Sequence, residues 1–272
     1  MKDETIKSIL LRVNTLKNRL ILKSIFVGIS SSLLVILYRI MIIKADLIRE
    51  YALHRYSQNK YEIVFILLVV IINSYIVDRL VKSEPMISGS GIPQIRGILL
   101  RKIYYNPLSV ICKKIIGGFL AVVNGLSVGR EGPSIQVGAT VGMQVSKILN
   151  LNKIEEKYLV TAGASAGLAA AFNAPLSAVI FSLEELHKNF SPVILLTSMA
   201  SAIISDFISK SVFGLKPVFD FKLNNTLPLN YYPILIALSI LTGILGVYFN
   251  RCLIRTLELT KSLNIRCLQH LY

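Results

Sequence analysis

The chain has 272 residues, of which 53% are hydrophobic and 17% are charged, and its formal net charge is +15. With a mean hydropathy of +0.61 it holds too much Leu, Ile and Val for one soluble core, which excludes an ordinary soluble domain and a disordered chain. No nucleic-acid-binding motif accompanies the positive charge, so we expect the basic loops to face anionic lipid headgroups. The composition therefore predicts an integral membrane protein with no nucleic-acid partner.

Residues 1–19 form a polar, basic segment that we expect to lie in the cytoplasm. The apolar run Leu20–Ile43 predicts a spanning helix, because it is about twice the usual length of the apolar part of a signal peptide and no clear cleavage site ends it. Lys23 and Arg39 lie near the ends of this run, where long side chains can snorkel toward water. Four basic residues in 44–60, against five in 1–19, slightly favour a cytoplasmic amino terminus.

A second span is predicted at Tyr61–Val77, after which the apolar segments become short and are interrupted by Gly and Pro. These segments are Pro107–Ser127, Pro133–Leu149, Tyr158–Phe172 and Pro175–Leu186. Few of them reach the roughly 20 residues that a helix needs to cross a bilayer. Interrupted segments are tolerated in a membrane only where they are buried in protein or line a watery cavity, so the pattern favours a transporter or channel.

Two longer apolar runs follow, Pro192–Ser209 and Tyr231–Leu257, and a polar loop separates them. Asp206 and Arg251 lie near the ends of these runs, where ionisable residues usually serve as interfacial anchors. Earlier in the chain, the small residues of Ala162–Ala171 predict close packing between helices. Gly138 and Gly142 predict the same kind of packing.

Three interruptions share one design, a glycine-rich or Asn-containing turn followed by proline: GSGIP at 89–93, GREGP at 129–133 and NAP at 173–175. Proline is expected at the first helical position, where its missing N–H costs nothing. Glycine lets several N–H groups converge on one point, and the positive end of the helix dipole adds to them. Each turn is therefore a candidate anion site that binds without a full positive charge, which would hold an anion too tightly to release it.

Glu131 lies inside the second interruption, immediately before a predicted helix. Its carboxylate would occupy the position of a bound anion and would leave that position when protonated, which describes a proton-dependent gate. A helix-capping carboxylate is the alternative interpretation. Glu184 and Glu185 end another apolar run, and we expect Glu184 to be solvated, whereas Glu185 could collect protons from the aqueous side.

An enzymatic alternative comes from residues 163–167, which match the GxSxG pattern of serine hydrolases around Ser165. No strand precedes this pattern, and none of the three histidines lies in a later apolar helix, so we do not expect an enzyme. The cysteines Cys112, Cys252 and Cys267 form no CxxC pair, which indicates neither a metal site nor a redox couple. We expect no metal and no cofactor.

The three interruptions, in this order and spacing, closely resemble motifs of the CLC family of chloride channels and chloride/proton antiporters. The first resembles the family's GSGIP segment, and the second its GREGP segment, which continues here as Ser134-Ile135-Gln136. The third, AFNAP at 171–175 followed by Glu184-Glu185, resembles a further family block. Gln94 departs from the glutamate that commonly follows GSGIP.

The resemblance implies an all-α polytopic membrane protein in which two inverted repeats enclose anion sites at their interface. On this basis 20–210 is the first membrane repeat, 211–230 a loop, 231–258 the first helix of the second repeat and 259–272 a tail. We find no second-half GxFxP segment and no later tyrosine to close the central site. The resemblance thus covers about half to two-thirds of the expected protein. We expect that the isolated chain does not transport. It would then be a fragment, a truncated gene product, a part of a split protein or a scaffold subunit.

The resemblance also implies roles for individual residues. Chloride would be bound by the Ser90 hydroxyl and by backbone groups of two segments, Ser90-Gly91-Ile92 and Arg130-Glu131-Gly132. Glu131 would be the external gating glutamate and Glu185 the internal proton-transfer glutamate, which antiporters usually have and channels usually lack. Ser90, where nitrate-preferring relatives tend to carry Pro, favours chloride.

The predicted activity is therefore chloride/proton antiport, with a passive chloride channel as the alternative. Its expected partners are chloride, protons and the lipid bilayer, and its expected location is the cell membrane as a multi-pass protein. We expect assembly as a homodimer or with a complementary second half.

Overall fold

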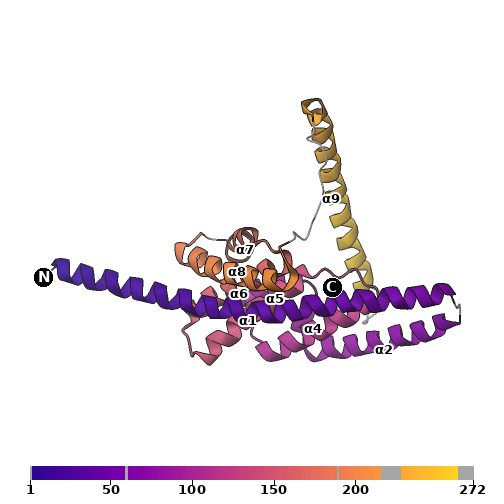
Figure 1. Cartoon of the computed structure of the whole chain (residues 1–272), viewed down its shortest axis with the longest axis horizontal. Coiled ribbons are helices and arrows are strands. Elements are labelled where there is room, and N and C mark those ends of the chain that lie inside the picture. The colour runs from indigo at the N-terminus through magenta and orange to yellow at the C-terminus, as the bar shows by residue number, and fades with distance from the viewer. Residues whose placement is uncertain (1, 59–60, 189, 216–227, 263–272) are drawn as a thin grey trace. The chain divides into compact units, whose positions relative to one another are not determined.

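The computed structural model describes the chain at residues 2–58, 61–188, 190–215 and 228–262, and side chains are described from Lys17 onward except at 56–60, 62, 189, 216–227, 257 and 260–272. The chain divides into two units, Met1–Val218 and Phe219–Tyr272. All regular structure in the described residues is helical (Figure 1). The predicted loop 211–230 and tail 259–272 lie mostly outside the described residues.

The first helix is much longer than the apolar run that predicts it. α1 runs without interruption over Lys2–Gln58, so the stretch 44–58, which we expected between two spans, is helical. The charged residues of this stretch are good helix formers, and 29–58 contains neither glycine nor proline to end the helix. A 57-residue helix is about 85 Å long, well beyond the thickness of a bilayer.

The short interrupted segments form short helices, as the sequence predicts. After α2 (Glu62–Ser83) and a 3₁₀ turn η1 (Pro85–Ile87) the chain forms α3 (Ile92–Leu99), α4 (Pro107–Val123), α5 (Glu131–Ile148), α6 (Lys153–Phe172), α7 (Pro175–Phe181), the π-helical turn η2 (Ser182–His187) and α8 (Pro192–Phe213). α6 begins five residues before the predicted Tyr158, because the Asn152 carboxamide caps it by accepting from the amides of Ile154 and Glu155.

Proline occupies the predicted first helical position only in α7. Pro93 is the second residue of α3, and Pro133 is the third residue of α5, which begins at Glu131 instead. All three positions lie in the first helical turn, where an amide lacks an intrahelical acceptor, so the missing N–H costs nothing at any of them. One consequence is functional, because Glu131 lies within the helix rather than ahead of it.

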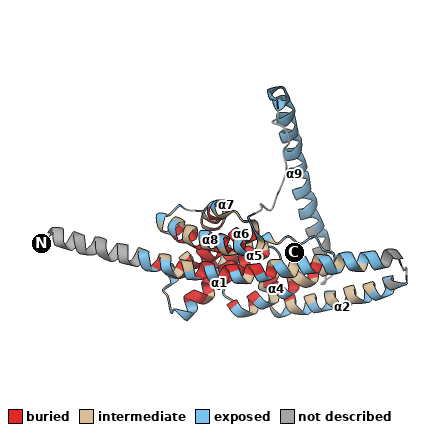
Figure 2. Ribbon diagram, viewed as in Figure 1, coloured by how far each residue is buried: buried red, intermediate tan, exposed pale blue. Residues whose placement is uncertain are grey.

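The centre of unit 1 is the pair α5 and α6, which pack through glycine as predicted. A Cβ added at Gly138 would collide with the backbone carbonyl of Gly163, and one at Gly142 would collide with that of Leu159. Gly167 similarly faces the carbonyl of Ser134. Backbone contacts this close are possible only without side chains. Most residues of both helices are buried (Figure 2).

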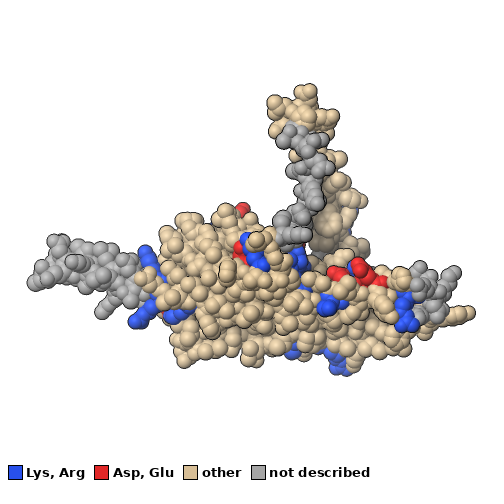
Figure 3. All heavy atoms as spheres, viewed as in Figure 1, with Lys and Arg blue, Asp and Glu red and all other residues tan. Residues whose placement is uncertain are grey.

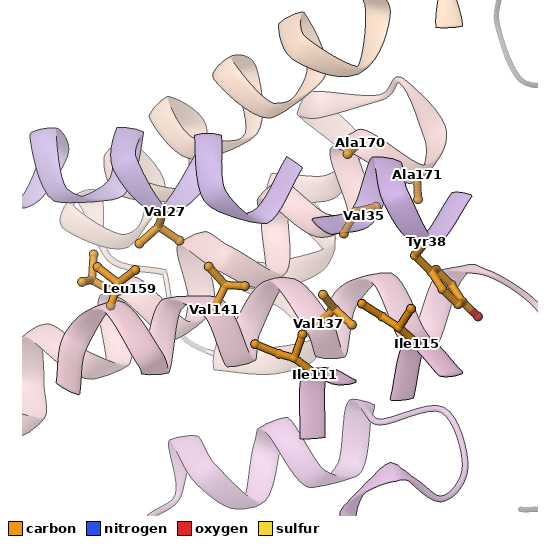
Figure 4. Close-up of a cluster of buried hydrophobic side chains, with 11 residues drawn as sticks. Val27, Val35, Tyr38, Ile111, Ile115, Val137, Val141, Leu159, Ala170 and Ala171 are labelled. Atoms are coloured by element: carbon orange, nitrogen blue, oxygen red, sulfur yellow. The ribbon is translucent and has the colours of Figure 1, made fainter. Parts of the chain in front are cut away.

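α1 and α4 cover this pair and supply much of its apolar packing. Figure 4 shows side chains of α1, α4, α5 and α6 meeting in one cluster, which includes Val27, Val35, Tyr38, Ile111, Ile115, Val137, Val141, Leu159, Ala170 and Ala171. Ala170 and Ala171 of α6 belong to the same cluster as the valines of α1 and α5. This packing holds the amino-terminal end of α5, where the candidate site begins, in a fixed place.

Polar side-chain interactions connect α1 to the rest of the bundle at both ends of its apolar run. Lys23 pairs with Glu155 of α6 at 2.9 Å. Arg39 does not snorkel toward water as expected, since its Nη1 lies 3.5 Å from the Ala170 carbonyl and 3.4 Å from Asn173 Oδ1. Its guanidinium also stacks 3.9 Å from the ring centre of Phe213. Arg39 thus caps the carboxyl end of α6 and joins it to α1 and α8.

α8 packs against α6 through hydroxyl groups. Ser205 donates to the carbonyl of Ala166 at 2.7 Å and Ser209 to that of Ala170 at 2.9 Å. Asp206, which we expected at the interface as an anchor, is buried and pairs with Lys210 at 2.7 Å.

Four helical stretches in the described residues are long and apolar enough to cross a membrane: Lys17–Arg55, Ile63–Ser83, Pro192–Phe213 and Leu229–Thr256. The last belongs to unit 2, which consists of a 3₁₀ turn η3 (Leu229–Tyr231) and α9 (Tyr232–Ser262), and all of its described side chains are exposed. On the face shown in Figure 3, charged residues form small groups on a mostly uncharged surface. This distribution fits a protein surrounded by lipid.

Candidate anion-binding site

The first two interruptions, GSGIP and GREGP, meet in space although 40 residues separate their glycines in sequence. A Cβ added at Gly132 would lie 2.5 Å from the carbonyl oxygen of Ser90 and 3.0 Å from its Cα. The backbone of Gly132, the second residue of α5, therefore packs directly on the backbone of Ser90, which precedes α3. Two helix amino termini, with their free N–H groups and positive dipole ends, converge here.

The turn before α3 needs glycine at two positions. Gly89 has φ +64° and Gly91 has φ +86°, both in the left-handed region. A Cβ at Gly91 would also lie 2.5 Å from Oε1 of Gln136. Between these glycines the Ser90 hydroxyl oxygen accepts from the Ile92 amide at 3.4 Å, which orients the side chain at the first turn of α3.

Three side chains donate hydrogen bonds to the carbonyls of this loop. The buried Lys114 ammonium of α4 donates to the carbonyls of Ile87 and Gly89, each at 2.7 Å. The Gln136 carboxamide of α5 donates to Met86 at 2.7 Å, and that of Gln94 donates to Ser88 at 2.9 Å. These hydrogen bonds hold the loop before α3 against α4 and α5.

Glu131 is the first residue of α5 and its side chain is exposed. The carboxylate folds back over the preceding turn, with Oε2 3.2 Å from the position that a Cβ at Gly129 would take. A carboxylate in the first turn is stabilised by the helix dipole. This location is compatible with both the gate and the cap that the sequence suggests.

Arg130 connects the second interruption to the third. Its guanidinium lies 5.9 Å from the ring centre of Phe172, the last residue of α6, and its carbonyl accepts from the Ser134 hydroxyl at 2.6 Å. Asn173 follows in the left-handed conformation, φ +56°, and α7 then begins at Pro175. Arg130 and Glu131 thus lie beside the end of the bundle where α6 ends and α7 begins.

Glu185 lies in η2 and is half-buried, whereas Glu184 is exposed, as expected for a solvated carboxylate. One Glu185 oxygen is 3.6 Å from Nη1 of Arg96 on α3. In the same turn, the His187 Nδ1 is 3.3 Å from the Thr161 hydroxyl of α6. Burial, and the positive charge of Lys157, lower the pKa of His187.

The two candidate proton-handling glutamates lie at different levels of α6. Glu131 follows Arg130, which contacts Phe172, and Glu185 lies in the turn that contacts Thr161. A helix rises about 1.5 Å per residue, so these levels differ by about 16 Å. The geometry brings Ser90, Gly91, Ile92, Arg130, Glu131 and Gly132 to one region and leaves Glu185 at another.

Ser165, the centre of the GxSxG pattern, lies in the middle of α6 with no exposed surface. Its hydroxyl donates to the Thr161 carbonyl at 3.1 Å. A nucleophile elbow requires an exposed serine at a sharp turn between a strand and a helix. The surroundings of Ser165 are those of a packed helix.

The sequence interpretation missed the residues that support the loop, above all Lys114 and Gln136. A signal existed for Lys114, because a lysine in the apolar run Pro107–Ser127 must find a partner when that run is buried. Gln136 was visible only as the residue that continues GREGPSI. No local pattern indicates that both side chains reach the same loop.

Comparison with known proteins shows to which family this chain belongs. A sequence profile described as "Voltage gated chloride channel" matches residues 68–271. The H(+)/Cl(-) exchange transporter ClcA of Vibrio campbellii is 35% identical over 185 residues, which are 66% of this chain and 38% of that protein. The ClcA of Salmonella arizonae is 34% identical over 184 residues, 65% of this chain and 38% of that protein.

Solved structures of other proteins are similar to this chain over most of its length. A slow cyanobacterial Cl-/H+ antiporter matches 93% of this chain and 61% of its own with a TM-score of 0.82 and 28% identity. A CLC-type fluoride/proton antiporter matches 91% of this chain and 60% of its own with a TM-score of 0.75 and 22% identity, which shows the common fold. The chain belongs to the voltage gated chloride channel family, the CLC proteins. It spans 38% of the length of the curated relatives it matches.

Proposed function

We propose that this chain supplies the chloride and proton sites of a CLC-type chloride/proton antiporter in the cell membrane, and that it catalyses no chemical reaction. The observation that carries the proposal is the backbone contact between Gly132 and Ser90. It joins the amino termini of α3 and α5, whose dipoles and N–H groups favour an anion without a full positive charge. The antiport activity of the similar ClcA and cyanobacterial proteins supports the same assignment.

In the proposed mechanism chloride is bound by the Ser90 hydroxyl and by backbone amides at the start of α3 and α5. The Glu131 carboxylate competes with chloride for the dipole of α5 and releases the position when it is protonated. Glu185 passes protons from the inner aqueous side, from the turn that contacts Thr161 of α6. The separation of Glu185 from Glu131 lets a proton and a chloride ion enter the protein by different routes from the inner side.

The activity requires more of the transporter than this chain. Ser90 and Glu131 are exposed in unit 1, and in an all-helical transporter an anion site needs protein on every side to exclude lipid. We propose that a second copy or a complementary polypeptide completes the assembly. A passive chloride channel and a scaffold subunit without transport activity are the alternatives.

The test starts from the complex isolated from its native membrane in mild detergent and reconstituted in chloride-loaded liposomes. Chloride efflux is recorded with a silver chloride electrode and proton uptake with a pH electrode. Efflux with proton uptake supports antiport, and Glu131→Gln should then abolish the proton uptake while chloride still moves. Glu184→Gln, which removes an exposed carboxylate from η2, is the matched control and should leave coupling intact.

The other outcomes each contradict a part of the proposal. Chloride efflux without proton uptake in the unaltered complex would assign a passive channel. An intact complex that moves no chloride would assign the scaffold role. Unchanged proton coupling in Glu131→Gln would remove the gate from this residue.

A further inference from the structure

A cavity lies between α1, α2 and the carboxyl end of α4. Its volume is about 520 Å³, which is within the range of about 300–1,000 Å³ typical of ligand pockets. None of the residues of the candidate anion site lines it. The cavity therefore calls for a separate explanation.

The walls of the cavity are apolar. α2 contributes two adjacent pairs, Phe65-Ile66 and Val69-Val70, which one helical turn places on the same face. α1 contributes Ile48 and Ala52, again one turn apart, and Val123 closes the cavity from α4. A lining of this kind favours a hydrocarbon chain over a polar ligand.

The edge of the cavity is positively charged. Arg49 and Arg55 of α1 both line it, together with Tyr51 and Asn124. Arg49 pairs with Asp46 at 3.1 Å, and the Arg55 guanidinium stacks 5.9 Å from the ring centre of Tyr51. Among the described residues that line the cavity, the charged ones are these two arginines, and neither Asp nor Glu is present. Guanidinium is the side-chain group best matched to phosphate.

The position of the cavity relative to the bilayer decides which ligand reaches it. α1 over Lys17–Arg55 and α2 over Ile63–Ser83 are both long and apolar enough to cross a membrane, and no residue in the most apolar window of α2 is buried. α2 therefore presents its side chains to lipid. The two arginines follow the apolar run Leu20–Ile43 and precede the α2 stretch that begins at Ile63, so they lie at the polar end of both apolar stretches, where headgroups are expected.

We propose that this cavity, lined by α1, α2 and the end of α4, binds an anionic phospholipid. An acyl chain lies between Ile48 and Val69 with its side against Val123, and the phosphate binds Arg49 and Arg55. The proposal depends on membrane insertion alone and is independent of chloride transport.

Native mass spectrometry of the full chain released from detergent tests the proposal. Phosphatidylglycerol and phosphatidylcholine with identical acyl chains are the probes, so that only the headgroup charge differs. We expect the chain to prefer phosphatidylglycerol, and the double variant Arg49→Gln/Arg55→Gln to lose about fivefold in binding for each arginine removed. Arg79→Gln/Arg101→Gln, which removes two exposed arginines that do not line the cavity, should keep the preference.

A second variant tests the apolar part without a change of charge. Ala52→Phe fills the space between α1 and α2 and should reduce binding of both lipids, while its thermal unfolding shows whether the fold is intact. Equal binding of the two lipids by the unaltered chain would overturn the proposal. A preference for phosphatidylglycerol that survives in Arg49→Gln/Arg55→Gln would also overturn it. A dimer that forms without bound lipid and is lost in Ala52→Phe would instead assign the cavity to a second copy of the chain.

Discussion

Gly132 and Ser90 are in backbone contact, so close that a Cβ at Gly132 would lie 2.5 Å from the Ser90 carbonyl oxygen. The contact fixes the distance between the first turns of α3 and α5, and any side chain at position 132 would force them apart. Gly132, the second glycine of GREGP, is thus explained by its packing on GSGIP. Several consequences of this arrangement can be measured.

Gly132→Ala should weaken chloride binding, because the added methyl group must displace the Ser90 backbone. Overpacking of this kind costs about 1–3 kcal/mol, and each 1.4 kcal/mol corresponds to about a tenfold loss of affinity. Isothermal titration of the isolated complex with chloride measures the effect. Gly243→Ala is the control, since a Cβ there would have no atom within 4 Å, and equal affinities in the two variants would contradict the role of the contact.

Lys114→Met should loosen the loop before α3. The substitution removes the cost of burying a charge, but it leaves the carbonyls of Ile87 and Gly89 without their donor, at about 1–3 kcal/mol for each unsatisfied group. We expect faster hydrogen exchange at the amides of 85–91. Lys113→Met changes the neighbouring, half-buried lysine in the same helix, and comparable exchange in both variants would show that Lys114 does not support the loop.

Gly138→Ala should destabilise the fold as a whole, because the new methyl group would overlap the Gly163 carbonyl at the centre of the α5–α6 contact. We expect a loss of at least about 1–3 kcal/mol, seen as a lower unfolding temperature. Gly117→Ala is a stringent control, because Gly117 is also buried in a helix but has no atom within 4 Å of the added Cβ. That variant should be neutral or slightly stabilised, and equal loss in both would refute the packing argument.

The free energy of unfolding should decrease as the pH is lowered, because of His187. Burial and Lys157 lower its pKa in the folded state, so the unfolded state binds more protons and folding becomes less favourable as pH falls through about 6.5. His187→Gln should therefore show a smaller drop in unfolding temperature between pH 7.5 and 5. His54→Gln, at an exposed position on α1, should retain the full drop, and identical pH profiles for His187→Gln and the unaltered chain would exclude this cause.

Much of the fold could be predicted from the sequence because glycine and proline mark the helix boundaries. Pro107, Pro175 and Pro192 each begin a helix where the sequence predicts it. The glycine contacts of Gly138 and Gly142 were also predictable, since only small residues allow two helix backbones to approach this closely. Hydropathy failed at 44–58, because a change from apolar to charged residues alters the surroundings of a helix without ending it.

The candidate site could be predicted only in part. Local patterns indicate helix starts at Gly91 and near Glu131, but the meeting of these two turns comes from tertiary packing. The same limit applies to Lys114, whose carbonyl partners lie 25 and 27 residues away, and to Arg39, which the sequence places near water and the structure places over Phe213. In each case a long side chain contacts a group that is distant in sequence, and no local pattern indicates that contact.

Bromide replaces chloride in many anion sites and scatters anomalously, so a crystal of the complete assembly grown in bromide locates the anion directly. We predict an anomalous peak between the Ser90 hydroxyl and the first-turn amides of α5, which strengthens in Glu131→Gln because the competing carboxylate is gone. A bromide ion bound elsewhere, with none beside Ser90 in either protein, would contradict the account.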